Sequence, residues 1–261
     1  MLRTNRLKQK LREGKEVFGL FCSIPSPVVV EMIGLAGYDF VIIDTEHVLI
    51  NPETIEHMIR AAEAVDLTAL VRVPEADAGA ILRALDGGAY GIVVPHIESI
   101  EQAEFIVKAS RYFPQGERSL NGGRPGAFGK NSLLAYMSRA NDEIMVIPMI
   151  ESKQGVERIE EIVSVEGIDM IMVGTADLSQ SYGVPWQTQH EVVRKAVRTV
   201  CSSAVKKDIP FCAIPRKLDE MDEWRESDVK AYVLGDERGI AFRALQDHLN
   251  KYVKEMKIKI I

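Results

Sequence analysis

The sequence predicts a (β/α)₈ TIM barrel that forms a single domain over residues 1–261. Eight short apolar runs recur along the chain, and amphipathic stretches with helical periodicity separate them. Eight alternating strands and helices are typical of a closed parallel barrel, and 261 residues with 46% hydrophobic content suffice for one large core. An open doubly wound sheet is the alternative, but no GxGxxG fingerprint follows the first strand.

The expected strands occupy residues 17–23, 40–44, 68–73, 91–97, 144–150, 170–174, 210–214 and 231–235. Helical periodicity is clearest over 52–65, 99–110 and 153–165. The connection 111–141 is long and begins rich in Gly and Pro, so we expect it to shape the mouth of the pocket. The last 25 residues are predicted to be a helix that extends beyond the barrel and is used in oligomerisation.

Composition excludes several classes of partner. The net charge of −6 arises from 38 acidic and 32 basic residues scattered along the chain, so no basic stripe is available for nucleic acid. The three cysteines are odd in number and lack metal-type spacing, which favours a reducing compartment over a disulfide framework. No apolar run approaches the roughly 20 residues of a membrane helix, and no signal peptide is recognisable. We therefore expect a cytoplasmic protein that contacts neither membrane nor nucleic acid.

Polar residues gather where the expected strands end, which is where barrel enzymes carry their active sites. They are Asp44, Glu46, His47, Arg72, His96, Glu151 and Asp177. No strand ends in a lysine, so a Schiff-base aldolase is disfavoured. A GxSxG nucleophile elbow and a glycine-rich phosphate loop after strands seven and eight are also absent from the sequence.

Glu151 and Asp177 indicate a divalent metal. Two carboxylates that converge on one pocket repel each other unless a cation lies between them. Carboxylate ligation with open positions suits Mg²⁺ or Mn²⁺, and Co²⁺ or Zn²⁺ is compatible with the same site. The alternative is that each carboxylate only caps the helix that follows it. The helix start in GTADLS also offers the backbone N–H groups of Gly174, Ala176 and Asp177 to a small carboxylate.

Arg72 lies in an apolar strand, where a buried guanidinium requires an anion. Asp44 or Glu46 is the expected partner. The pair is either purely structural or leaves donors of Arg72 free for a substrate oxyanion, and we favour the second interpretation. His47 has the side-chain chemistry of a general base, the alternative being a cap on the helix after Asn51. His96 is expected to be a packed, hydrogen-bonded residue rather than a pocket residue.

Five segments together resemble the HpcH/HpaI family of class II pyruvate aldolases, over about residues 17–245. They are DTEH at 44–47, Arg72, ALDGGAYGIVVPHI at 84–97, MIES at 149–152 and GTADLS at 174–179. The resemblance implies that Glu151 and Asp177 hold the metal and that Arg72, held by Asp44, steadies an enolate. It further implies an acid/base pair of His47 with Asp86, from the same subunit or a neighbour, and a supporting role for Glu46.

The implied reaction is reversible, metal-dependent aldol cleavage of a 4-hydroxy-2-oxo acid to pyruvate and an aldehyde. The family also implies homohexamers, built as trimers of dimers with exchanged C-terminal helices. The chain departs from the family at Met149, at GERS (116–119) and at AIPRK (213–217), and the last two are expected to lie near the aldehyde. Two rivals remain: an acyl-CoA lyase of the citrate or malyl-CoA type, and a non-catalytic barrel that binds a 2-oxo acid.

Overall fold

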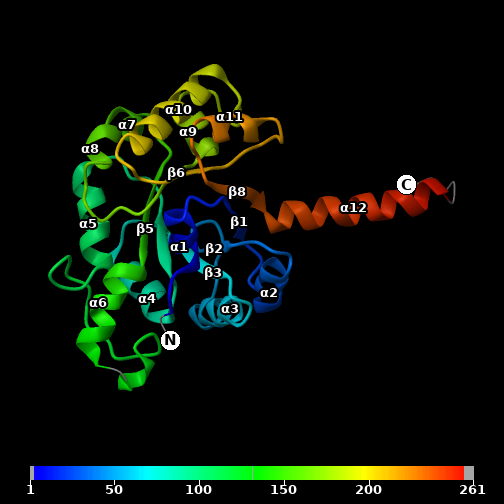
Figure 1. The fold of residues 1–261 in the computed structure, drawn as a ribbon. Helices are drawn as coiled ribbons and strands as arrows, with labels where there is room; N and C mark the ends of the chain where they lie inside the picture. The colour runs from blue at the N-terminus through cyan, green and yellow to red at the C-terminus, as the bar shows by residue number, and fades with distance from the viewer. Residues whose placement is uncertain (1–2, 131, 256–261) are drawn as a thin grey trace.

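The computed structural model describes residues 3–130 and 132–255, and its core is a closed barrel of eight parallel strands in sequence order (Figure 1). The strands are β1 (Val17–Cys22), β2 (Phe40–Asp44), β3 (Thr68–Arg72), β4 (Gly91–Val94), β5 (Met145–Ile150), β6 (Ile171–Val173), β7 (Phe211–Ala213) and β8 (Ala231–Asp236). β8 pairs with β1 and closes the sheet. The predicted fold class is therefore confirmed.

The predicted strand positions agree closely with these bounds, and the largest difference is at β4. This strand was expected to continue to residue 97 but ends at Val94. His96, two residues later, has a φ of 54°, which is incompatible with an extended strand. The turn there redirects the chain at the mouth of the barrel.

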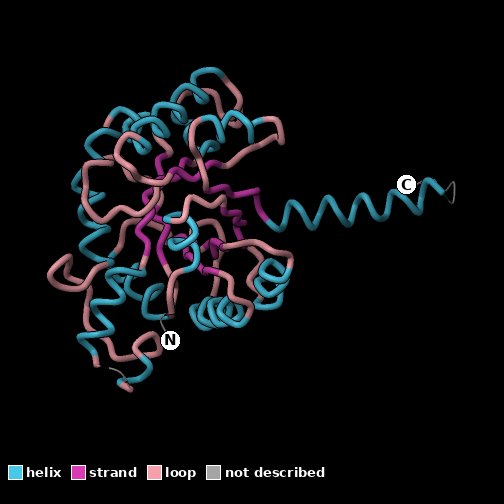
Figure 2. Tube along the Cα trace, viewed as in Figure 1, coloured by secondary structure: helices cyan, strands magenta, loops and turns pink. Residues whose placement is uncertain are grey.

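Helices surround the strands (Figure 2). They are α1 (Arg6–Arg12), α2 (Pro27–Leu35), α3 (Pro52–Ala64), α4 (Ala78–Gly87), α5 (Ile100–Ser110), α6 (Leu133–Glu143), α7 (Lys153–Glu157), α8 (Ile159–Ile162), α9 (Thr175–Ser181), α10 (Glu191–Val205), α11 (Glu220–Glu226) and α12 (Glu237–Glu255), with a 3₁₀ turn at Ala127–Gly129. The stretch predicted as one helix over 153–165 is divided into α7 and α8 at Arg158. No described helix has the length and apolar character needed to cross a membrane.

Alternate residues of the strands point into the barrel, as the two-residue period of a strand requires. The interior cluster consists of Leu7, Val17, Phe40, Ile42, Leu70, Val93, Met145, Ile147, Met149, Met170, Met172, Cys212, Ala231 and Val233. Leu7 belongs to α1, so this short helix closes the N-terminal end of the barrel. The other face of the sheet packs against the surrounding helices in a second, larger cluster.

The long connection after α5 does not lie at the pocket mouth within one chain, so that prediction is wrong. β4 runs to the mouth and α5 returns to the opposite end, where the connection therefore begins. There Arg111 donates to Asp169, two residues before β6, and Arg124 pairs with Glu63 at the end of α3. The segment 116–119 belongs to this connection and lies at the same end, away from the strand ends where the aldehyde was expected.

α12 projects away from the barrel (Figure 1), as predicted for the C-terminal helix, although residues 256–261 lie outside the described residues. Phe242, Leu245, Leu249 and Tyr252 are between 55% and 71% exposed. Their spacing of three, four and three residues places them along one face of the helix. An apolar stripe of this kind is unusual on a helix that touches no other part of its own chain along most of its length.

Candidate active site

Asp44 and Arg72 are the last residues of β2 and β3, and they are direct register partners in the sheet. Both continue the inward-facing positions of their strands, after Ile42 and Leu70 respectively. Arg72 Nε donates to Asp44 Oδ1 at 3.0 Å, and Nη2 donates to Oδ2 at 2.8 Å. Asp44, one of the two partners expected for Arg72, therefore forms a bidentate pair with it at the mouth.

The environment of this pair determines its charge. Burial raises the pKa of Asp44, but hydrogen bonds from Arg72 and the charge of its guanidinium hold the net value below the ordinary one. The Arg72 guanidinium also lies 4.7 Å from the centre of the Phe21 ring. Both side chains are almost fully buried, so neither can move far without leaving an uncompensated charge.

Glu46 is the second anion beside Arg72. Its Oε2 lies 3.0 Å from Arg72 Nη1, but the two are not aligned as a hydrogen bond and this oxygen has no hydrogen-bond partner among the described residues. The backbone N–H of Glu46 donates to Asp44 Oδ1 at 3.1 Å, which fixes the turn after β2. Nε and Nη2 are thus held by hydrogen bonds to Asp44, whereas Nη1 has only an ion-pair contact, with Glu46.

Glu151 follows β5 and continues its inward-facing residues Ile147 and Met149. It is 3% exposed, and its Oε1 accepts a hydrogen bond from the His96 backbone N–H at 2.9 Å. Gly174 makes room for the carboxylate, because a Cβ at that position would lie 2.1 Å from Glu151 Oε2. Ser152, not Glu151, caps α7, so the capping interpretation of Glu151 is wrong.

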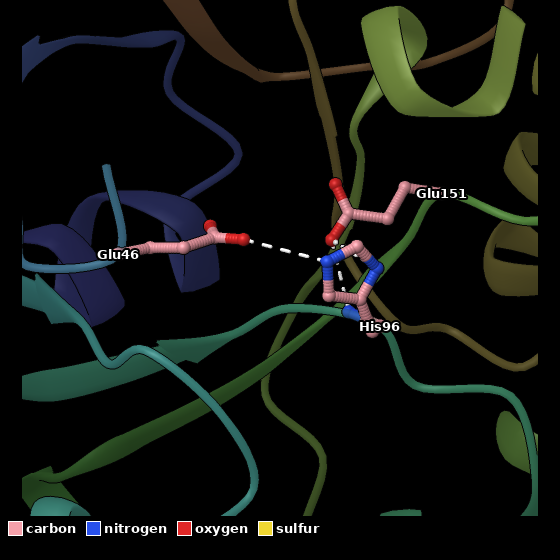
Figure 3. A group of neighbouring side chains, drawn as sticks. All are labelled: Glu46, His96 and Glu151. Carbon is pink, nitrogen blue, oxygen red and sulfur yellow. Dashed lines mark hydrogen bonds and ion pairs between the residues drawn. The ribbon is translucent and has the colours of Figure 1, made fainter. Parts of the chain in front are cut away.

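His96 lines the pocket, contrary to the expectation that it packs in the structure. Its side chain is 57% exposed and stands between two carboxylates, as Figure 3 shows. Nε2 lies 3.4 Å from Glu46 Oε1, and Nδ1 lies 3.4 Å from Glu151 Oε1. The left-handed backbone of His96 after Pro95 produces this orientation, and the sequence gives no signal of it.

These carboxylates fit a divalent cation. Burial, together with the negative charges of Glu46 and Asp177, raises the pKa of Glu151 to about 7, although His96 acts in the opposite direction. A cation held by oxygen ligands would offset both the burial and the repulsion. Glu46, His96 and Glu151 each offer a ligand atom within 4.8 Å of the others. This group differs from the predicted set of Glu151 and Asp177.

Asp177 lies in the first turn of α9, close enough to act electrostatically on Glu151. The N-cap of α9 is Gly174, and no side chain caps the helix, so Asp177 is not its capping residue. Asp177 and Ala176 remain half-buried at the mouth beside Gly174. The carboxylate is thus available for a ligand.

His47 lies in the loop after β2 with 55% of its side chain exposed. Its backbone N–H donates to Asp44 Oδ1 at 3.4 Å, and its Nε2 lies 3.9 Å from Glu46 Oε2. It does not cap α3, because Asn51 performs that role by accepting from the Glu53 N–H. The imidazole therefore projects from the rim of the mouth.

Asp86 does not meet His47 within the chain. It lies near the end of α4, which runs from the mouth to the N-terminal end of the barrel. Its Oδ1 accepts from Arg118 Nη2 at 2.7 Å, and its Oδ2 accepts from Asn121 at 2.9 Å. An Asp86 partner for His47 would therefore have to come from another copy of the chain.

Sequence analysis missed Glu237, which follows β8 and is 7% exposed. Its Oε1 accepts the backbone N–H of Ser23 at 2.6 Å and that of Ile24 at 2.5 Å. Ser23 Oγ is in turn 3.5 Å from Asp44 Oδ2. Glu237 thus joins the start of α12 to the loop beside Asp44. Its position as the first residue after an apolar strand was the available signal.

Comparison with known proteins yields consistent matches. The family model described as HpcH/HpaI aldolase/citrate lyase matches residues 17–238. The hydroxypyruvate/pyruvate aldolase of Sagittula stellata is 34% identical over 207 residues, covering 79% of this chain and 81% of that protein. The 4-hydroxy-2-oxovalerate aldolase of Novosphingobium aromaticivorans is 39% identical over 184 residues, covering 69% and 68%. The crystal structure of citrate synthase SbnG has a TM-score of 0.90 and 45% identity, covering 97% of this chain and 99% of that one.

Proposed function

The chain belongs to the HpcH/HpaI aldolase/citrate lyase family and is a carbon–carbon lyase, and we propose that it cleaves a 4-hydroxy-2-oxo acid reversibly to pyruvate and an aldehyde. The observation that carries this proposal is the buried Arg72–Asp44 pair beside the Glu46, Glu151 and Asp177 carboxylates. Aldol cleavage develops negative charge on a 2-oxo acid, and preorganised donors stabilise such charge. Lys153, the lysine nearest in sequence to Glu151, is 60% exposed and pairs with Glu157, so it does not enter the site.

Glu151 and Asp177 would hold the divalent metal, with Glu46 and His96 beside it. Bound there, the ion would supply Lewis-acid polarisation of the 2-oxo acid. Mg²⁺, Mn²⁺ and Co²⁺ fit the oxygen donors, and Zn²⁺ is compatible because His96 adds a nitrogen. The backbone N–H groups of Ala176 and Asp177 would face the substrate carboxylate, but that of Gly174, which was predicted with them, donates to the Ile150 carbonyl at 3.1 Å and is not free for it.

Arg72 would contribute Nη1 to the oxyanion, because Asp44 already engages Nε and Nη2. In the synthetic direction His47 would remove a methyl proton from pyruvate and pass a proton to the aldehyde oxygen as the new carbon–carbon bond forms. In cleavage it would take the proton of the C4 hydroxyl as the C3–C4 bond breaks and would then protonate the enolate carbon to give the methyl group. Asp86 of a neighbouring copy would orient the imidazole through its second nitrogen. Glu46 would keep both Arg72 and His47 in place.

We also propose that the chain forms a homo-oligomer, a hexamer built as a trimer of dimers, as its family implies. The apolar stripe of α12 and the exposed side chains of Val28, Met32 and Leu35 on α2 are surfaces that a second copy would cover. The three cysteines are buried and free, which suits the cytoplasm.

Methyl-proton exchange tests the pyruvate half without knowledge of the aldehyde. Pyruvate in D₂O should lose its methyl proton signals when protein and Mg²⁺, Mn²⁺ or Co²⁺ are added, as followed by NMR. A screen of aldehydes with pyruvate then identifies the second substrate. If the protein binds 2-oxo acids but never exchanges their protons or turns over any aldehyde, the barrel is a binding protein rather than an aldolase.

The 45% identity to a citrate synthase supports a second candidate, condensation of oxaloacetate with an acyl-CoA thioester. Incubation with oxaloacetate and acetyl-CoA distinguishes the two functions. The second candidate requires citrate and free CoA thiol to appear together. The first requires a hydroxy-oxo acid from pyruvate and aldehyde, with no dependence on CoA.

A further inference from the structure

Arg118 is a buried arginine whose ion pair, within residues 3–130 and 132–255, is with Asp86 alone. Its side chain is 0% exposed, and Nη2 lies 2.7 Å from Asp86 Oδ1. The guanidinium also lies 4.7 Å from the centre of the Tyr112 ring. Nε and Nη1 are buried and have no hydrogen-bond partner in the part of the chain that the structure describes. One carboxylate and one aromatic face therefore compensate this charge.

The backbone of the long connection fixes the position of Arg118. Its N–H donates to the Arg111 carbonyl at 2.8 Å, just after α5. A Cβ at Gly116 would lie 2.5 Å from the same carbonyl oxygen, so this close return of the chain requires a glycine. The side chain of Asn141 holds Tyr112 by accepting its N–H at 2.7 Å and donating to its carbonyl at 2.9 Å. The guanidinium thus rests on a rigid support.

Asp86 keeps part of its carboxylate open. Oδ1 accepts from Arg118, and Oδ2 accepts from Asn121 at 2.9 Å. An ionised carboxylate offers about four lone-pair positions, so two hydrogen bonds do not saturate it. The Asp86 side chain is 22% exposed. An imidazole N–H from another copy can therefore bind Asp86 without displacing Arg118.

A purely structural ion pair explains this arrangement less well. A buried ion pair contributes little to stability, and apolar residues of similar volume often serve as well. The unpartnered nitrogens of Arg118 add a further cost. Arg124, on the same connection, shows the contrast, because it engages both carboxylate oxygens of Glu63 through Nη1 and Nη2. Arg118 gives Asp86 a single hydrogen bond and leaves the carboxylate able to accept another.

We propose that Arg118 is a positioning residue that orients the Asp86 carboxylate for His47 of a neighbouring copy. Arg118 does not touch the substrate. Its Nη2 restrains one carboxylate oxygen while Asn121 restrains the other, so the open edge of Asp86 keeps one direction. This inference rests on the proposed aldolase function and adds a residue to the acid/base pair of that site.

Methyl-proton exchange of pyruvate in D₂O, with metal present, measures the effect. We expect Arg118→Met to lower the exchange rate by about tenfold or more, the scale of losing a hydrogen bond to a charged group. Arg118→Lys keeps the charge but not the planar donor geometry, so its loss should be smaller. Arg124→Met is the matched control. It removes the guanidinium paired with Glu63 and should stay within about twofold of the wild type.

A double-mutant cycle determines whether Arg118 acts through Asp86. In the Asp86→Ala background, Arg118→Met should change the exchange rate by less than about twofold, because the carboxylate that it orients is gone. In the background with Asp86 intact, the same substitution should have its full effect. Losses that multiply in the double variant would mean that Arg118 acts elsewhere, and the proposal would fail.

Mixed oligomers place Arg118 on the Asp86 side of the shared site. Arg118→Met and His47→Ala chains refolded together should recover about a quarter of the sites, where an intact His47 faces an intact Arg118 and Asp86. Arg118→Met mixed with Asp86→Ala should show no gain over the average of the two alone, because both defects lie on the same side. An arginine that only supports its own barrel would also impair the His47 of its own chain. Absence of recovery in the first mixture would therefore overturn the proposal.

Two reference measurements distinguish failure of this inference from failure of the proposed function. A wild type that does not exchange pyruvate protons refutes the aldolase function and the role of Arg118 with it. Recovery in the mixture of His47→Ala with Asp86→Ala, together with full exchange in Arg118→Met, refutes only the role of Arg118. Circular dichroism and size-exclusion chromatography check that each variant folds and assembles. Arg118→Lys replaces Arg118→Met in the mixtures if the methionine variant does not fold.

Discussion

Arg72 donates two parallel hydrogen bonds to Asp44, from Nε at 3.0 Å and from Nη2 at 2.8 Å. The two residues are register partners on the neighbouring strands β2 and β3. The strands themselves position this fork, so it is ready before a substrate arrives. A preorganised donor of this kind stabilises charge without reorganisation during the reaction.

Arg72→Lys keeps the charge but loses the fork that matches Asp44. We expect turnover to fall by roughly 10² or more, the scale associated with loss of one oxyanion donor. Steady-state kinetics with saturating metal measures the effect. A lysine variant with near-normal turnover would assign the pair to structure alone.

Glu151→Gln should weaken metal binding, and excess metal should partly restore the rate. In the wild type, metal affinity should fall by about tenfold per pH unit as the pH drops below about 7 and should level off above it. The sign follows because burial raises the pKa of Glu151 to about 7, so protons compete with metal below that pH. Titration calorimetry from pH 5.5 to 8.5 measures both effects. Unchanged affinity in the variant would remove Glu151 from the ligands.

Asp177→Asn and His96→Ala distinguish the two candidate ligand sets. If Glu151 and Asp177 hold the metal, the Asp177 variant should lose far more metal affinity than the His96 variant. The His96 side chain is 57% exposed, and its nitrogens lie 3.4 Å from Glu46 and from Glu151, so in that case it would lie beside the metal without binding it. The opposite order would favour the group of Glu46, His96 and Glu151.

His47→Ala should reduce methyl-proton exchange of pyruvate by about 10² or more, since general-base assistance is typically worth 10²–10⁴. Metal affinity should remain nearly unchanged, because His47 lies on the rim, 3.9 Å from Glu46. NMR in D₂O measures the exchange rate. Exchange at the wild-type rate would mean that another group removes the proton.

Mixed oligomers test whether Asp86 acts across subunits. His47→Ala and Asp86→Ala chains should each be nearly inactive alone, but an equal mixture should recover about a quarter of the sites, where an intact His47 faces an intact Asp86. Activity measured after unfolding and refolding the two variants together gives the result. Each variant refolded separately is the control, and no recovery would exclude the shared pair.

The sequence by itself determined the barrel, because eight apolar runs and intervening amphipathic helices admit few other ways to bury their faces. It also predicted a carboxylate partner for Arg72, since a guanidinium buried in an apolar strand requires one nearby, but it left Asp44 and Glu46 both open. Glu151 was recognisable because it follows an apolar strand at the edge where barrel enzymes carry their active sites. These features follow from the apolar periodicity along the chain and from the rule that the C-terminal ends of parallel barrel strands lie at the same edge.

Only the tertiary structure decided the positions of His96, Asp86 and the long connection. His96 lies between Glu46 and Glu151 because of one left-handed backbone angle, which the sequence around it did not reveal. Asp86 and the segment 116–119 lie at the opposite end because the direction of α4 and α5 separates them from the mouth. The Thr175 contact of Arg216 likewise joins residues 41 positions apart, through strand neighbours whose closeness arises only when the barrel closes.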